Sequence, residues 1–95
     1  MILMYIHTHS AERCLGDKPK ELLDMMEKLR QGCQKAGIKV LASYMAPHEH
    51  AEYTVFETDN LPALETVLVP KTLWGTAKLV PVVAMEQLEQ YLKEQ

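Results

Sequence analysis

The stretch from Lys39 to Asp59, KVLASYMAPHEHAEYTVFETD, constrains this chain most, because it reads as two strands joined by a polar connection. Residues with β-branched or aromatic side chains are frequent in both arms, Val40 to Met45 and Tyr53 to Thr58. The connection contains Pro47, which cannot donate a hydrogen bond to a strand ladder. The segment therefore predicts an antiparallel hairpin whose long polar end carries the triplet His48 to His50.

The patterns on either side of this hairpin predict the remaining elements. Apolar residues on alternating faces predict a strand over residues 2–8. Apolar residues at helical spacing predict a helix that begins at Pro19 and ends before Gly37. The hairpin strands span 38–46 and 51–58, a second helix runs from about Leu61 to Pro70, and a strand over 77–83 precedes a short helix over 85–93. Pro81 in the last strand indicates an edge position or a bulge.

This element order is β-α-β-β-α-β with an added helix, which predicts the α+β, ferredoxin-like arrangement of an antiparallel sheet with helices on one face. A chain of 95 residues is expected to form a single domain, 1–95. Each strand is apolar on both faces, although two helices cover only one. Because a large exposed apolar patch is rare on a soluble monomer, we expect a homodimer that closes sheet against sheet as a dimeric α/β barrel.

Composition and charge exclude several classes of partner. The chain has 10 basic and 13 acidic residues and a net charge of −3, which disfavours nucleic acid. No apolar run approaches the roughly 20 residues of a membrane span, and the opening MILMYI lacks the basic start of a signal peptide. We therefore expect a cytoplasmic protein with free thiols at Cys14 and Cys33, and no nucleotide cofactor, since no Gly-rich phosphate loop occurs.

The 4 histidines of the chain form two His-x-His pairs, His7 with His9 and His48 with His50. In an extended chain such a pair shares one face, and imidazole nitrogens suit Zn, Cu and Ni. The first and third strands are central neighbours in this fold, so the two pairs are expected to meet at one end of the sheet. The leading hypothesis is a transition-metal site (Ni, Zn or Cu), with the shell completed by the Cys14 thiolate or by a carboxylate from Glu12, Glu49 or Glu52.

Two other functions stay open, and the histidines can also be ordinary solvated residues. In the first, an enzyme acts on a small aromatic or carbonyl compound, with a general base among His7, His9 and His50 and oxygen-binding phenols among Tyr5, Tyr44 and Tyr53. In the second, the chain is a binding or structural subunit without chemistry. RNA-recognition domains share the element order, but the acidic chain disfavours that reading.

The segment TVFETDNLPALE, followed by Trp74 and then LVPVV, resembles small stand-alone members of the dimeric ferredoxin-like α/β-barrel superfamily. The resemblance covers roughly residues 38–85. That superfamily includes isomerases, monooxygenases, haem-related enzymes, nickel-binding proteins and uncharacterised members. The resemblance implies the fold and the homodimer, and it leaves the isomerase-like, monooxygenase-like and metal-binding functions open.

Overall fold

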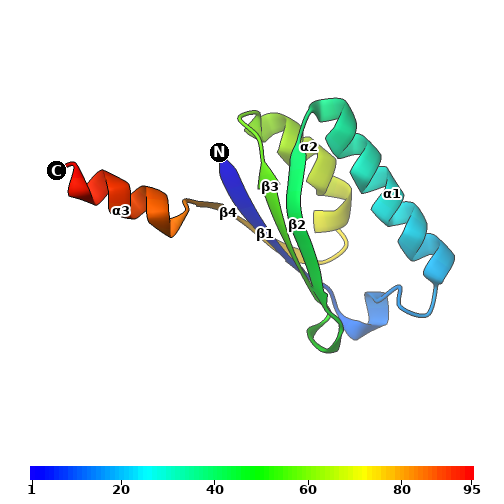
Figure 1. The fold of residues 1–95 in the computed structure, drawn as a ribbon. Coiled ribbons are helices and arrows are strands. Elements are labelled where there is room, and N and C mark those ends of the chain that lie inside the picture. The colour runs from blue at the N-terminus through cyan, green and yellow to red at the C-terminus, as the bar shows by residue number, and fades with distance from the viewer.

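The computed structural model describes residues 1–95 and contains one four-stranded sheet, two helices packed on it and a third helix that extends from its end (Figure 1). The elements in chain order are β1 (Ile2–Thr8), the 3-10 turn η1 (Ala11–Arg13), α1 (Pro19–Ala36), β2 (Lys39–Ala46), the 3-10 turn η2 (Pro47–Glu49), β3 (Ala51–Glu57), α2 (Leu61–Thr72), β4 (Thr76–Val82) and α3 (Met85–Lys93).

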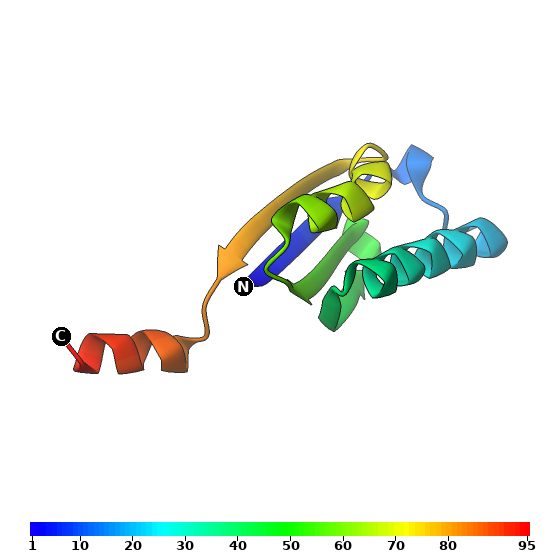
Figure 2. The same cartoon turned by 90° about the horizontal axis from the view of Figure 1, so that it is seen from above.

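The strands lie in the order β2-β3-β1-β4, and all neighbours are antiparallel. In this register Leu3 of β1 lies between Phe56 of β3 and Pro81 of β4, so β4 is an edge strand, as Pro81 predicts. Helices α1 and α2 lie on the same face of the sheet (Figure 2). The structure thus confirms the α+β, ferredoxin-like βαββαβ arrangement.

Local chemistry sets most helix ends where the sequence places them. Pro19 occupies the first turn of α1, where its missing N–H costs nothing. The helix ends at Gly37, which adopts a left-handed φ of 69° that a residue with a Cβ disfavours. At the start of α2 the side chain of Asn60 accepts a hydrogen bond of 3.1 Å from the backbone N–H of Ala63.

The end of α2 differs from the prediction, because the helix continues past Pro70 to Thr72. A proline there removes only one hydrogen bond of the last turn, and the backbone N–H of Leu73 still donates to the carbonyl of Val69 at 2.9 Å. The two added residues bring Thr72 to the sheet, where its hydroxyl lies 3.0 Å from the phenol oxygen of Tyr5.

The hydrophobic core lies between the sheet and the two packed helices. It consists of Leu3, Tyr5, Cys33, Ile38, Phe56, Leu64 and Leu68. Each fully buried large side chain contributes about 1.5–3 kcal/mol to folding. Because alternate residues of β1 face this core, His7 is buried on the same face as Leu3 and Tyr5.

The opposite face of the sheet, which we call the open face, has no covering element. It presents apolar and aromatic side chains from all four strands: Ile2, Met4, Ile6, Ala42, Tyr44, Tyr53, Val55, Val80 and Val82. Helix α3 does not cover it, because the helix extends beyond the end of β4 and away from α1 and α2 (Figures 1 and 2). None of the helices is both long and apolar enough to span a membrane.

Candidate metal centre

Pairing of β1 with β3 brings the two histidine segments together at one end of the sheet. Beyond the last register pair, Thr8 with Ala51, the backbone N–H of His9 donates to the carbonyl of His50 at 3.1 Å. The two imidazole rings are edge to face, with centroids 5.3 Å apart. The expectation that His50 lies alongside the end of the first strand is confirmed.

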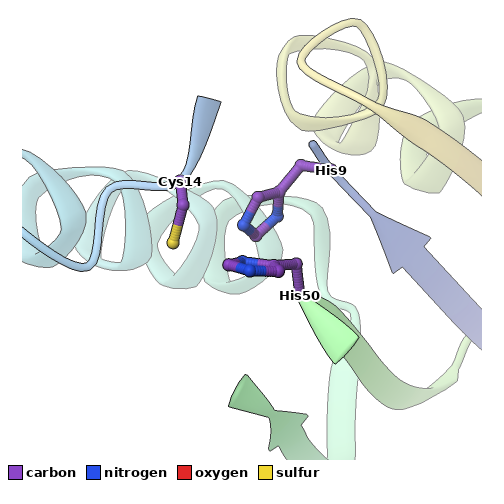
Figure 3. A group of neighbouring side chains, drawn as sticks. All are labelled: His9, Cys14 and His50. Atoms are coloured by element: carbon purple, nitrogen blue, oxygen red, sulfur yellow. The ribbon is translucent and has the colours of Figure 1, made fainter. Parts of the chain in front are cut away.

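Cys14 joins these two histidines (Figure 3). Its sulfur and one ring nitrogen from each of His9 and His50 all lie within 4.8 Å of one another. In a tetrahedral zinc site, with bonds of about 2.0–2.3 Å, the ligand atoms are roughly 3.3–3.7 Å apart. A movement of about 1 Å by these partly buried side chains therefore closes the group around an ion. We call His9, Cys14 and His50 the ligand trio.

A strained turn places His50 in the ligand trio. His50 is the one residue other than glycine with a positive φ, 51°, and it ends η2 with its backbone N–H donating to the carbonyl of Pro47 at 3.2 Å. The left-handed conformation costs a residue with a Cβ about 1–2 kcal/mol. Such strain gathers at functional sites, where the surrounding structure maintains it.

Reciprocal hydrogen bonds between Arg13 and Trp74 hold the loop that carries Cys14. The indole N–H of Trp74 donates to the carbonyl of Arg13 at 2.7 Å, and the Arg13 guanidinium donates to the carbonyl of Trp74 at 3.3 Å. The Cys14 sulfur itself accepts a hydrogen bond of 3.4 Å from the backbone N–H of Gly16. The loop is thus tied to the start of β4, on the far side of β1 from β3.

The His9 imidazole is suited to bind a metal as the neutral ring. Burial lowers the pKa of His9, and the nearby charge of His50 lowers it further, so the ring is neutral at pH 7. Its Nε2 atom is buried without a hydrogen-bond partner. Buried polar atoms are seldom left unpaired, and an ion bound through this nitrogen would supply the missing partner. The donor set and this orphaned nitrogen both fit a transition metal.

His7 lies deeper, behind His9. Its side chain is buried, and its ring stacks on Tyr5 and lies 6.0 Å, centroid to centroid, from the ring of His9. Burial lowers the pKa of His7, although a hydrogen bond with the backbone of Lys71 opposes that effect. Its Nε2 also lacks a hydrogen-bond partner.

The other residues predicted for the site lie outside the ligand trio. Glu52 forms a largely buried ion pair with Lys71. Glu49 accepts a hydrogen bond of 3.3 Å from the phenol of Tyr53, and His48 is exposed on η2. The structure therefore groups one histidine of each predicted pair with Cys14 and leaves His7, His48, Glu49 and Glu52 out of that group.

A cavity of about 270 Å³ lies beside the ligand trio. Its walls are mostly apolar and come from Leu15, Leu22, Met25, Met26 and Met45. Its polar lining includes His7, His9 and the Glu52–Lys71 ion pair, together with Arg13 and Ser43. Because His9 belongs both to the trio and to the cavity lining, a small molecule in the cavity would lie next to a metal ion bound by the trio.

The fold and the site define a class: a small α+β protein with a ferredoxin-like sheet and a candidate metal centre at one sheet end. Residues 3–95 match the profile of the domain of unknown function DUF3303, and the chain belongs to that family. No curated protein matches it.

Sequence reasoning missed two residues that shape this region, Trp74 and Lys71. Trp74 reads as part of a turn, and nothing local shows that its indole holds the Cys14 loop 61 positions away. Lys71 falls beyond the predicted helix end at Pro70, so its approach to Glu52 depends on the two residues by which α2 continues past that proline. A prediction that the second helix continues past Pro70 would have placed Lys71 near the sheet.

Proposed function

We propose that the protein binds one transition metal ion, Zn²⁺, Cu⁺ or Ni²⁺, through His9, Cys14 and His50. The observation that carries this proposal is the convergence of three ligand atoms within 4.8 Å from three separate segments of the chain. A thiolate with two imidazoles favours zinc or copper(I), because thiolates are soft ligands. Three protein ligands leave a fourth position for water or a small molecule.

The test begins with chelator-treated protein titrated with Zn²⁺, Cu⁺ or Ni²⁺ at pH 7.5, with affinity measured by competition against a chromophoric chelator. We expect one ion per chain. An ion present at a hundred times its dissociation constant stabilises the folded state by about 2.7 kcal/mol. For a domain of this size that energy raises Tm by roughly 10–20 °C.

Single substitutions identify the ligands. His9→Gln, Cys14→Ser and His50→Gln each remove one ligand atom, and each should weaken binding by more than the roughly 10–100-fold that loss of an outer-shell partner costs. His48→Gln is the matched control, because His48 is exposed on the same turn but outside the trio. Equal affinity in all four variants, or no change in melting with any of the three ions, would overturn the proposal.

The cavity favours a second candidate function, an enzyme acting on a small aromatic or carbonyl compound in an isomerase-like or monooxygenase-like reaction. His7 is its best general base, because the ring is buried at the cavity with an unpaired Nε2. Tyr5 is less available, since its phenol is hydrogen-bonded to Thr72 and burial raises its pKa. Loss of turnover in His7→Gln, in protein that binds no metal, would favour this function over the first.

We also propose that the chain works as a homodimer whose two open faces pack together. The apolar side chains of this face come from all four strands, and nothing within the chain covers them. A two-fold pairing of identical surfaces is the commonest way to bury such a face. Light scattering should give twice the chain mass of 10.8 kDa.

A further inference from the structure

Helix α3 has an apolar stripe that its own chain leaves uncovered. Its exposed members, between 41% and 70% accessible, are Met85, Leu88, Tyr91 and Leu92. No residue of α3 is buried. The radius of gyration is 15.1 Å, against about 12.4 Å expected for a compact chain of this length. Both observations describe a helix held away from the body of the molecule (Figures 1 and 2).

A helix of this length does not persist on its own in water. α3 has 9 residues, and isolated helices below about 12–15 residues are marginal even with favourable sequences. Val83 and Ala84 connect it to β4, and in this structure it extends beyond the end of that strand instead of folding back on its own sheet (Figures 1 and 2). Its apolar stripe is therefore open to a surface on another molecule.

The opposite edge of the sheet offers a matching apolar surface. Near the start of β2, Leu41 is about half exposed and lies outside the regular pairing, because the β2–β3 register shifts between Val40 and Ala42. Ala42 pairs with Val55 and therefore lies on the open face. The register places this part of β2 at the same end of the sheet as Val82, the last residue of β4. We call Leu41 and Ala42 the β2 patch.

We infer that α3 of one subunit packs its apolar stripe on the β2 patch of a second copy of this chain, and that the exchange is reciprocal. This inference rests on the proposed homodimer. When two sheets face each other across a two-fold axis parallel to the strands, β4 of one lies over β2 of the other with matching ends level. Each α3 then begins beside the partner's β2 patch.

The charge on the open face favours the same axis. Lys78, which makes no ion pair in its own chain, lies opposite Ile6 in the register, and Tyr44 lies at the same level two strands further along. The axis parallel to the strands brings Lys78 over Tyr44 of the partner subunit, where ammonium and aromatic ring attract each other. An in-plane axis across the strands would instead pair β4 with β4 and send α3 toward the polar end near Thr76.

Helix α3 also enlarges the interface. Four strands of 7 or 8 residues cover a flat area of roughly 440 Å², from about 3.3 Å per residue and about 4.8 Å between strands. Each partner in a standard stable interface contributes about 800 Å² of accessible surface. α3 and the β2 patch that receives it add accessible surface to that of the open face.

Cross-linking between separately labelled chains tests the contact. Chains carrying Leu88→Cys are mixed with chains carrying Leu41→Cys, both with Cys14→Ser, and treated with a short bifunctional maleimide. Cys33 is buried and stays unreactive. We expect a cross-linked dimer from this mixture and none when Leu41→Cys is replaced by Lys20→Cys at the start of α1.

A charge placed in the stripe provides the second readout. Leu88→Glu should raise the dimer dissociation constant by at least about tenfold, since each tenfold corresponds to 1.4 kcal/mol and burial of a leucine contributes about 1.5–3 kcal/mol. Gln90→Glu, on the polar side of α3, should leave it unchanged. A dimer that neither cross-links nor responds to Leu88→Glu overturns the proposed contact of α3 with the β2 patch and leaves the pairing of the two open faces intact. A monomeric wild-type chain overturns both proposals.

Discussion

Replacement of Gly75 by alanine should cost this protein much of its stability, because the backbone of Thr8 occupies the space that the new Cβ needs. An ideal Cβ at Gly75 lies 2.0 Å from the carbonyl oxygen of Thr8 and 3.1 Å from Nε2 of His7. The obstacle is main chain of the central strand, so relief requires β1 and the Gly75 turn to separate by about 1 Å or more. Over-packing of this kind costs about 3 kcal/mol, the upper end of its usual range.

The assay is thermal unfolding of metal-free protein, in which a loss of about 3 kcal/mol lowers Tm by roughly 12–24 °C for a domain of this size. Gly37→Ala is the reference, because its positive φ strains any residue with a Cβ although no atom lies within 4 Å of the new methyl. That strain costs about 1–2 kcal/mol. Should Gly75→Ala melt within a few degrees of Gly37→Ala, the close approach of Thr8 to Gly75 is not present in solution.

Two further outcomes follow from the site. Burial lowers the pKa values of His7 and His9 below 6.5 in the folded chain. As the pH falls from 6.5 toward those lowered values, these two histidines bind protons in the unfolded chain but not in the folded chain. Denaturant titrations of metal-free protein should therefore show stability falling across that window, less steeply in His7→Gln, and a flat profile would contradict neutral buried rings. Trp74→Phe removes the hydrogen bond to the Arg13 carbonyl, which should cost about 0.5–1.5 kcal/mol and weaken metal binding through the loop; unchanged affinity in a chelator competition would show that the loop holds without it.

Much of this fold could be predicted because the capping residues and the spacing of apolar residues indicate the same helices and strands. The cap at Asn60 and the left-handed Gly37 mark helix ends in the sequence and in the structure. Alternation along β1 places Leu3 and Tyr5 on the packed face. Pro70 misled the prediction, since proline is a weaker stop in the last turn of a helix than in its middle.

The candidate site was predictable only in outline. Strand order alone brings His9 to His50, because neighbouring strands place residues 41 positions apart side by side. Alternation along β1 places His7 on the packed face, but it does not separate His7 from His9, which has the same parity. β1 ends at Thr8, so His9 lies beyond the strand, and His50 reaches the trio through a left-handed backbone conformation that few histidines adopt. These two features carry no sequence signature.

The position of β1 at the centre of the sheet has a consequence for the order in which the protein can form. β1 leaves the ribosome before either of its neighbours, and it pairs with β4, whose residues follow about 74 positions later, so the sheet has a high contact order. During synthesis at about 5–20 residues per second, β1 waits for several seconds before both of its edges are paired. The β1–β3 pair that unites His9 with His50 can close in that interval, which makes the histidine end of the sheet available before β4 completes the domain.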